Sequence, residues 1–336
     1  MTSLVSFMAL FPDFRGATWD GWRGILERLT PDVREFFCIA GRGSGKSRIV
    51  ALLAAAFASR AYPLAPGEKI FIAVLAPDRK QSRVTFEYIR GLLRAVPSLT
   101  ALIESETRES LTLVNGVVIE VISASLAAPR GRAYALCICE EAAFLPTDQS
   151  ANPDTELLRA LRPALARVPG SLLAVVSSPY ARRGVLWTAF KRYHGQPDSD
   201  VVLVQASTLE LNPSFDRRAI SRAFEEDPAS AAAEYGAQFR DDIQSFISQD
   251  AIDQAVIPGR QELPFIPPPS GPLEYFGFVD PSGGSGADSF TLAIGHAVAR
   301  RRSPCWTKSL RSGRRSHRSR PLPSSPRCCR RIASIW

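Results

Sequence analysis

The chain has 336 residues, of which 45% are hydrophobic, and its 41 basic and 33 acidic side chains give a net charge of +8. Residues 301–336 hold eleven Arg or Lys and no acid, which leaves 30 basic against 33 acidic residues in 1–300. Net charge therefore gives no argument for a nucleic-acid partner of the body of the protein. No apolar run of about 18 residues predicts a membrane span. The six cysteines form no disulfide framework, which is typical of a reducing cytoplasm.

Apolar runs of strand length alternate with helical patterns over the first 200 residues. Continuous apolar strands separated by helices predict an α/β fold with a mostly parallel sheet covered on both faces. The expected strands are 35–40, 69–77, 117–124, 134–141 and 171–179. The expected helices are 48–60, 79–95, 153–168 and 184–193, followed by a helical pair in 212–242 that is broken at Asp227-Pro228.

Composition also predicts domain boundaries. We expect one domain in residues 1–245, a Pro-rich linker in 246–272, and the start of a second domain in 273–300, where the strand "LEYFGFVD" begins. Cys137 and Cys139 alternate along the 134–141 strand with no second Cys or His pair nearby, so core packing is favoured over a metal site.

The segment "CIAGRGSGKSR" (38–48) has the features of a phosphate-binding loop. Such a loop joins an apolar strand to a helix N-terminus, and its glycines let backbone N–H groups point at phosphate oxygens. Lys46 is expected to reach the β- and γ-phosphates of ATP, and the Ser47 hydroxyl to coordinate Mg²⁺. Ala40 stands where the pattern G-x-x-x-x-G-K-S has its first glycine. The predicted nucleotide-binding residues are Gly41, Arg42, Gly43, Ser44, Gly45, Lys46 and Ser47.

Two further strands end in residues suited to ATP hydrolysis. "YALCICEEAAF" ends in two acids: Glu140 is the candidate for the Mg²⁺ side, through a bound water, and Glu141 is the candidate base for the attacking water. In ATPases with such a strand, the acid on the Mg²⁺ side, here Glu140, is more often Asp. "LLAVVSSPYARRG" ends in Ser177 and Ser178, whose hydroxyls are placed to sense the γ-phosphate. The alternatives are a strand that ends in solvated acids and an ordinary strand end.

These motifs, in this order, resemble those of the large subunit of phage terminase, the motor that packages viral DNA. The resemblance covers residues 10–300 and is strengthened by "NPSFD", "EDPASAAAEYGAQFRDD" and "FVDPSGGSGADSFTLAIGH". It implies an ASCE-type P-loop ATPase followed by an RNase H-like nuclease whose acids hold two divalent metal ions. Asp280 matches the first metal-binding acid, whereas Asp288 is left open between a ligand and a loop acid.

The resemblance also implies partners and a mode of action. A ring of subunits would move double-stranded DNA into a procapsid, with a portal protein and a small terminase subunit as partners, in the cytoplasm of a bacterial host. Arg130, or else Arg132, would act on a neighbour's ATP. Ser177 and Ser178 would couple loss of the γ-phosphate to rotation of the 212–242 helices. Trp19 and Trp22 share a helix face and favour core packing, with contact to the adenine as the alternative.

Residues 301–336 break the pattern of the preceding chain. Their change to Arg, Ser, Pro and Cys is typical of a reading frame shifted near Arg300, so we expect this segment to be disordered and the nuclease to be incomplete. The alternative is a basic arm that grips DNA phosphates. For the whole chain, the rival interpretations are a helicase-like P-loop ATPase and a non-functional prophage remnant.

Overall fold

The computed structural model describes residues 3–123, 131–145, 153–196, 200–240, 275–280, 291–297 and 304–311. The chain divides into two compact units, Met1–Ser248 and Gln249–Trp336. Within the described part of the chain, no helix has both the length and the apolar content needed to cross a membrane.

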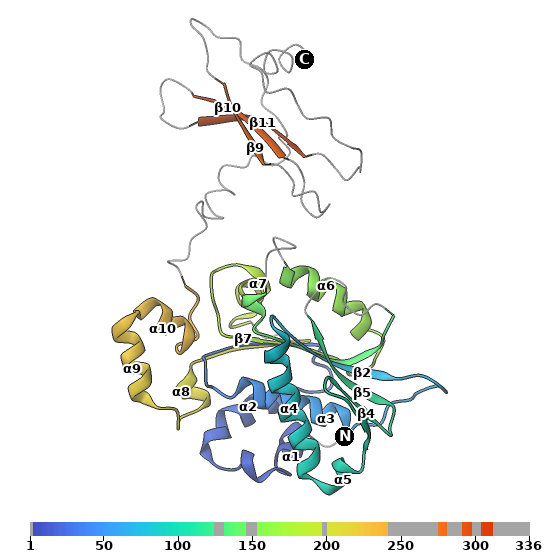
Figure 1. The fold of residues 1–336 in the computed structure, drawn as a ribbon. Coiled ribbons are helices and arrows are strands. Elements are labelled where there is room, and N and C mark those ends of the chain that lie inside the picture. The colour runs from blue at the N-terminus through green and yellow to red at the C-terminus, as the bar shows by residue number, and fades with distance from the viewer. Residues whose placement is uncertain are drawn as a thin grey trace, which may run out of the picture. The chain divides into compact units, whose positions relative to one another are not determined.

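The first unit is built on an eight-stranded sheet of order β3-β4-β5-β2-β6-β7-β1-β8 (Figure 1). The six strands from β5 to β8 in that order run parallel, and β3 and β4 extend the sheet as antiparallel strands. The strand bounds are β1 Glu35–Ala40, β2 Ile70–Ala76, β3 Ile103–Glu106, β4 Ser110–Leu113, β5 Val117–Ser123, β6 Tyr134–Glu140, β7 Leu172–Ser177 and β8 Val201–Ala206.

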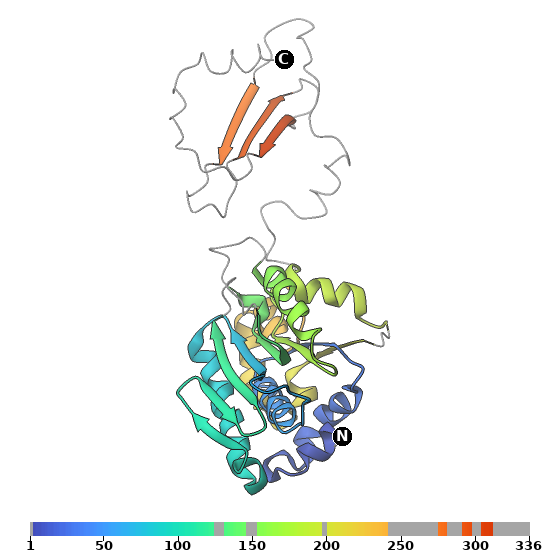
Figure 2. The same ribbon diagram turned by 90° about the vertical axis from the view of Figure 1, so that its right-hand side faces the viewer.

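Helices cover both faces of this sheet (Figures 1 and 2). One face carries α1 Leu4–Met8, α2 Asp20–Arg28, α3 Lys46–Ala58, α4 Arg79–Ala95 and α5 Pro97–Thr100. The other face carries α6 Pro153–Leu165 and α7 Gly184–Tyr193. After β8 come α8 Thr208–Leu211, α9 Arg217–Glu226 and α10 Pro228–Glu234. Short 3-10 helices lie at Pro12–Phe14, Ala17–Trp19 and Ala142–Phe144.

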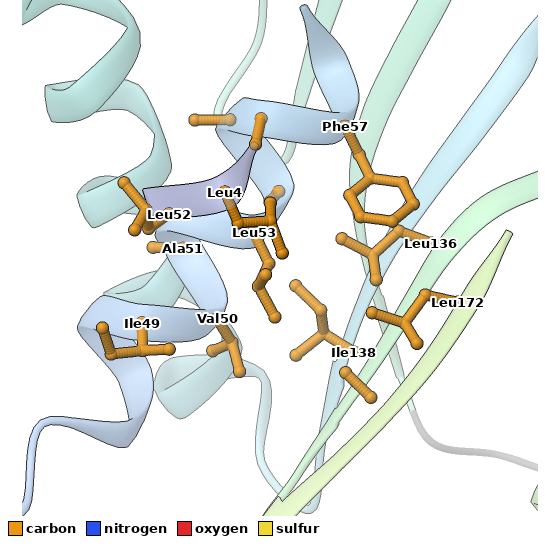
Figure 3. Packing of buried hydrophobic residues seen from close by; sticks show 14 of the residues in the cluster. Leu4, Ile49, Val50, Ala51, Leu52, Leu53, Phe57, Leu136, Ile138 and Leu172 are labelled. Atoms are coloured by element: carbon orange, nitrogen blue, oxygen red, sulfur yellow. The ribbon is translucent and has the colours of Figure 1, made fainter. Parts of the chain in front are cut away.

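The strands are apolar on both faces because both faces are covered. In β1, Phe36 packs in the core under α3 and Phe37 in the core under α6 and α7. The Ala-rich helix α3 is buried almost all round, and its Leu53 and Phe57 face the side chains of β6 (Figure 3). Small residues let this helix lie close to the sheet, which brings its first residue, Lys46, to the carboxyl ends of the strands.

The structure confirms the fold class and the elements that carry the motifs. The five expected strands are β1, β2, β5, β6 and β7, and the bounds of α4 and α7 agree with the prediction. The helical pair breaks at Asp227, which caps α10 with its side chain, while Pro228 opens the new helix. Cys38, Cys137 and Cys139 are buried free thiols, as core packing predicts.

Three strands of the first unit were not predicted. β8 is an edge strand whose burial alternates, and β3 and β4 present polar side chains on one face. Their pattern therefore lacks the continuous apolar run that identified the central strands.

The described part of the second unit is a three-stranded antiparallel sheet of order β11-β10-β9, formed by Tyr275–Asp280, Thr291–Ala297 and Pro304–Arg311. The expectation that all of 301–336 is disordered is therefore wrong for 304–311, which form β11. β10 pairs with β9 along one edge, and its other edge offers backbone partners that an extended segment can occupy; "PCWTKSLR" contains aromatic and β-branched residues that suit a strand. The expected linker 246–272, Asp288 and the rest of the tail lie outside the described residues.

Because α3 is packed in the core, shortening a side chain at the centre of this helix should lower the stability of the protein strongly. Leu53 is fully buried, so Leu53→Ala should lower the free energy of unfolding by about 2–5 kcal/mol. Leu10 is 50% exposed and provides the matched control, for which Leu10→Ala should cost less than about 0.5 kcal/mol. Urea unfolding followed by tryptophan fluorescence measures both, and equal losses would contradict the assignment of α3 to the core.

Candidate nucleotide site

The loop between β1 and α3 has a backbone that only glycine adopts without strain. Gly43 and Gly45 have φ angles of +77° and +96°. A Cβ at Gly43 would lie 2.3 Å from Cε2 of Phe215, so a side chain there is excluded by space as well as by backbone angle. The backbone N–H groups of Gly41, Arg42 and Ser44 donate to carbonyl oxygens of Ala206, Glu234 and Gly41, so the N–H groups left for a phosphate are those at the start of α3.

Lys46 is the first residue of α3 and is buried. Its Nζ donates to the carbonyl oxygens of Ala40 at 2.8 Å and Gly41 at 3.0 Å, and to Oγ of Ser178 at 3.1 Å. Burial lowers the pKa of Lys46, and the neighbouring carboxylate of Glu141 partly offsets this effect. The ammonium group is therefore held at the junction of the loop and β7 rather than in solvent.

The carboxyl ends of β1, β7 and β6 bring three distant motifs together. Ile39 pairs with Ser177, and Val176 with Glu140. The carboxylate of Glu141 accepts hydrogen bonds from Oγ of Ser177 at 3.1 Å and from the backbone N–H of Ser178 at 3.3 Å. Lys46, Ser178 and Glu141 are thus linked by hydrogen bonds, which the sequence predicted only as three separate motifs.

Glu141 has a left-handed backbone, with φ +46°, which is uncommon for a residue other than glycine. Its N–H donates to Val176 of β7 at 2.8 Å, which fixes the turn. This conformation costs about 1–2 kcal/mol and directs the Glu141 carboxylate to the end of β7. Strain of this kind is concentrated at functional sites.

Glu140 is buried beside the start of α3. It accepts hydrogen bonds from the hydroxyls of Thr85, on α4, and Ser47. Burial raises the pKa of the Glu140 carboxyl, and these two hydrogen bonds oppose the rise. Ser47 and Glu140 are therefore adjacent, as a shared Mg²⁺ site requires. The sequence analysis did not predict a role for Thr85. The signal that could have found it is the position of two hydroxyl side chains, Ser82 and Thr85, on the buried face of α4.

Trp19 and Trp22 pack behind the loop, which confirms the core-packing interpretation. Nε1 of Trp22 donates to the carbonyl oxygen of Ser44 at 2.7 Å in a buried position. The Trp19 ring lies against Gly45 and beside Phe14, with the two ring centroids 4.7 Å apart. The two indoles therefore support the loop from the side of the core.

The segment after β8 holds the outer side of the same loop. Oγ1 of Thr208 donates to the carbonyl of Arg42 at 2.8 Å, and Nδ2 of Asn212 to that of Gly43 at 2.9 Å. The N–H of Arg42 donates to the carbonyl of Glu234, at the end of α10, at 2.5 Å. These bonds connect the loop to α8 and α10. The sequence did not predict them, because residue type alone does not show which carbonyl oxygen a side chain contacts.

The residues present fit a bound nucleotide with Mg²⁺. The Ser44 hydroxyl is buried and has no hydrogen-bond partner within the described residues, so it is available to a phosphate oxygen. Lys46, Ser47 and Glu140 lie next to the same loop. This donor set suits an anion and a hard cation.

Of the remaining predicted site residues, Arg132 lies apart from this cluster, and Arg130 and Asp280 are not placed relative to it. Arg130 is outside the described residues. Arg132 precedes β6, at the amino ends of the parallel strands, where it pairs with Glu120 and stacks on Phe71 at 4.6 Å. Asp280 ends β9 in the second unit. Across the described ranges, no group of three or more His, Cys, Asp or Glu is arranged to hold a metal ion.

Two solved structures that are similar to this chain are large terminases of bacteriophages. The chain is similar to the large terminase of bacteriophage HK97, with 16% identity and a TM-score of 0.60, over 89% of this chain and 66% of that one. The protein has the fold of a phage large terminase. A second similar structure is the large terminase of a thermophilic bacteriophage in complex with ATP-gamma-S, at 13% identity and a TM-score of 0.46, over 82% of this chain and 64% of that one.

The chain spans 66% of the HK97 protein, which is just under two thirds of its length. A family model for the helicase domain of the RNA cytidine acetyltransferase NAT10/TcmA matches residues 37–152, which include β1, α3 and β6. No curated protein matches the sequence.

The support of the loop by Trp22 predicts a difference between two otherwise equal substitutions. Trp22→Phe and Trp19→Phe remove the same atoms, but only Trp22 bonds to the loop through its indole N–H within the described residues. Trp22→Phe leaves a buried carbonyl unpaired and should cost about 1–3 kcal/mol more than Trp19→Phe. Thermal unfolding of both variants tests this, and equal losses would show that the hydrogen bond contributes nothing.

Proposed function

We propose that the protein is the ATPase of a DNA-packaging motor, which hydrolyses ATP and moves double-stranded DNA into a procapsid. The observation that carries the proposal is the hydrogen-bonded link from Lys46 through Ser178 to Glu141 at the carboxyl ends of β1, β7 and β6. This link joins Lys46, which is expected to hold the phosphates, to Ser178, which is expected to sense the γ-phosphate, and to Glu141, which is expected to activate water.

Each residue has a distinct role in the proposed reaction. The loop N–H groups and Lys46 bind the β- and γ-phosphates, and Ser47 and Glu140 hold Mg²⁺, which supplies charge neutralisation at the phosphate oxygens. Glu141 accepts the proton of the attacking water. Ser177 and Ser178 keep the Glu141 carboxylate oriented through their hydroxyl and N–H groups.

The contacts of the loop suggest how hydrolysis produces motion. Lys46 binds Ser178 on one side, while the loop carbonyls bind Thr208 and Asn212 on the other. Loss of the γ-phosphate changes the partners of Lys46, and the loop passes this change to α9 and α10. This coupling to DNA, with a portal protein and a small terminase subunit as partners, is part of the proposal.

A helicase-like ATPase is the second candidate, and the family-model match over 37–152 favours it. It shares the chemistry of the first candidate but differs in the nucleic acid that activates it. Stimulation of ATP turnover by double-stranded DNA supports the packaging motor, whereas stimulation by single strands alone supports the helicase.

The split in roles predicts different defects for two variants. Lys46→Ala should abolish ATP binding, because Lys46 holds the phosphates in the ground state. Glu141→Gln should keep binding and lose about 10² to 10⁴ in turnover, because Glu141 acts on water only in the chemical step. Titration with a fluorescent ATP analogue and a phosphate-release assay measure the two effects, with the exposed Lys69→Ala as control. Equal loss of nucleotide affinity in both variants would refute the roles.

An arginine that acts on a neighbour's ATP predicts rescue by mixing. Arg130→Ala and Glu141→Gln should each be inactive alone. A mixture should regain turnover, because a Glu141→Gln subunit still supplies Arg130 to a neighbour with an intact Glu141. Turnover per subunit should also rise with protein concentration. If the mixture stays inactive while Arg132→Ala fails in the same way, the assignment to Arg130 is wrong.

A further inference from the structure

The helix α7 carries a basic surface that the nucleotide site does not use. Residues 180–196 contain no acid, and Arg182, Arg183, Lys191 and Arg192 are exposed. We call these four residues the α7 basic surface. The opposite side of the helix is buried through Leu186 and Ala189. The four cations are therefore directed away from the core that holds α7 in place.

A cluster of aromatic rings supports this surface. Trp187 stacks on Phe190, with centroids 5.5 Å apart and ring planes 18° apart, and meets the edge of Phe239 at 5.0 Å. The Arg182 guanidinium lies 5.5 Å and the Lys191 ammonium 5.9 Å from the centroid of the Trp187 ring. Cation–π contacts thus hold two charges against one neutral ring.

Several basic side chains of the first unit are neutralised by acids, whereas those of the α7 basic surface have few acidic neighbours in the sequence. Arg90, Arg94 and Arg162 form ion pairs with Glu106 or Glu35. Among the described residues, Arg183 and Lys191 take part in no ion pair, and neither does Arg192. The nearby Asp154 is already engaged, because its Oδ2 accepts the Val185 N–H at 2.6 Å. Charges left uncompensated at a surface attract an anionic partner.

This surface is also directly connected to the nucleotide site. Ser178 bonds to Lys46, and the chain reaches the first residue of α7 at Gly184. Gly184 has φ +79°, and a Cβ there would lie 2.3 Å from the Asp154 carboxylate. Between Ser178 and α7, the Tyr180 carbonyl oxygen accepts the Arg240 N–H at 2.8 Å and the Arg183 N–H donates to Ala181 at 2.7 Å, so this short segment is held at both ends and can pass a shift at Ser178 to the helix.

We infer that the α7 basic surface binds the phosphate backbone of double-stranded DNA, which deepens the proposed motor function and rests on it. The rings of Trp187, Phe190 and Phe239 pack on one another and are not free to stack on unpaired bases. The four cations, two just before α7 and two in its last turn, instead suit the phosphates along a duplex. The surface places a DNA contact one short segment away from the residue that senses the nucleotide.

The test uses the full chain carrying Arg183→Gln, Lys191→Gln and Arg192→Gln together. The matched control carries Arg34→Gln, Lys69→Gln and Arg167→Gln, three exposed cations at the amino ends of the strands. Both variants lose equal charge, and both keep the basic tail, so its contribution to DNA binding is constant. Binding of a fluorescent duplex is measured by anisotropy over a series of salt concentrations.

For the α7 variant we expect at least a tenfold loss of duplex affinity and a salt slope smaller by about 2–3, since each phosphate contact contributes about 0.9. DNA-stimulated ATP turnover should fall while basal turnover is kept. The control should match the unsubstituted protein. Equal losses in both variants, an unchanged α7 variant, or a loss seen only with single-stranded DNA would overturn the inference.

The experiment also separates this inference from the proposed function. If duplex DNA stimulates the unsubstituted protein and the α7 variant alike, the motor proposal stands and the surface assignment fails. If the unsubstituted protein neither binds duplex DNA nor responds to it, both fail together.

Discussion

A buried ammonium group organises the first unit. Removing the charge of Lys46 from water is costly unless hydrogen bonds replace the lost solvent, and two loop carbonyls and the Ser178 hydroxyl do so. These bonds require the end of β1, the start of α3 and the end of β7 to meet within a few ångströms. The order of the sheet satisfies this requirement, since β7 lies between β1 and β6. The hydrogen bonds that Lys46 needs therefore constrain both the order of the strands and the chemistry of the site.

The sequence predicted the central strands, the main helices and the residues of the phosphate loop, because each has a strong local pattern. A continuous apolar run identifies a strand covered on both faces, and Gly-rich turns before a helix are rare. What could not be predicted depends on contacts between distant segments. No local sequence pattern indicates three of the hydrogen bonds of the site: Trp22 to Ser44, Thr85 to Glu140 and Asn212 to Gly43.

Composition was a weaker guide than pattern at the end of the chain. A segment rich in Arg and Ser predicted disorder, yet 304–311 pair with β10. Backbone hydrogen bonds depend little on side-chain identity, so an exposed strand edge selects an extended neighbour even where hydrophobic burial is small. Charge content predicts solvation of a segment better than it predicts the absence of a strand.

The strained turn at Glu141 shows how the nucleotide site and α7 are joined. Its left-handed backbone persists because the N–H bonds to Val176 and the carboxylate to Ser177 and Ser178, so β6 and β7 fix it together. Beyond Ser178 the chain leads in five residues to α7, where the Val185 N–H donates to the carboxylate of Asp154. A change at the phosphate site is therefore not absorbed by a flexible loop on this side. Because packed elements move as rigid bodies, the proposed motor function predicts that the site and the surface of α7 shift together when the nucleotide changes.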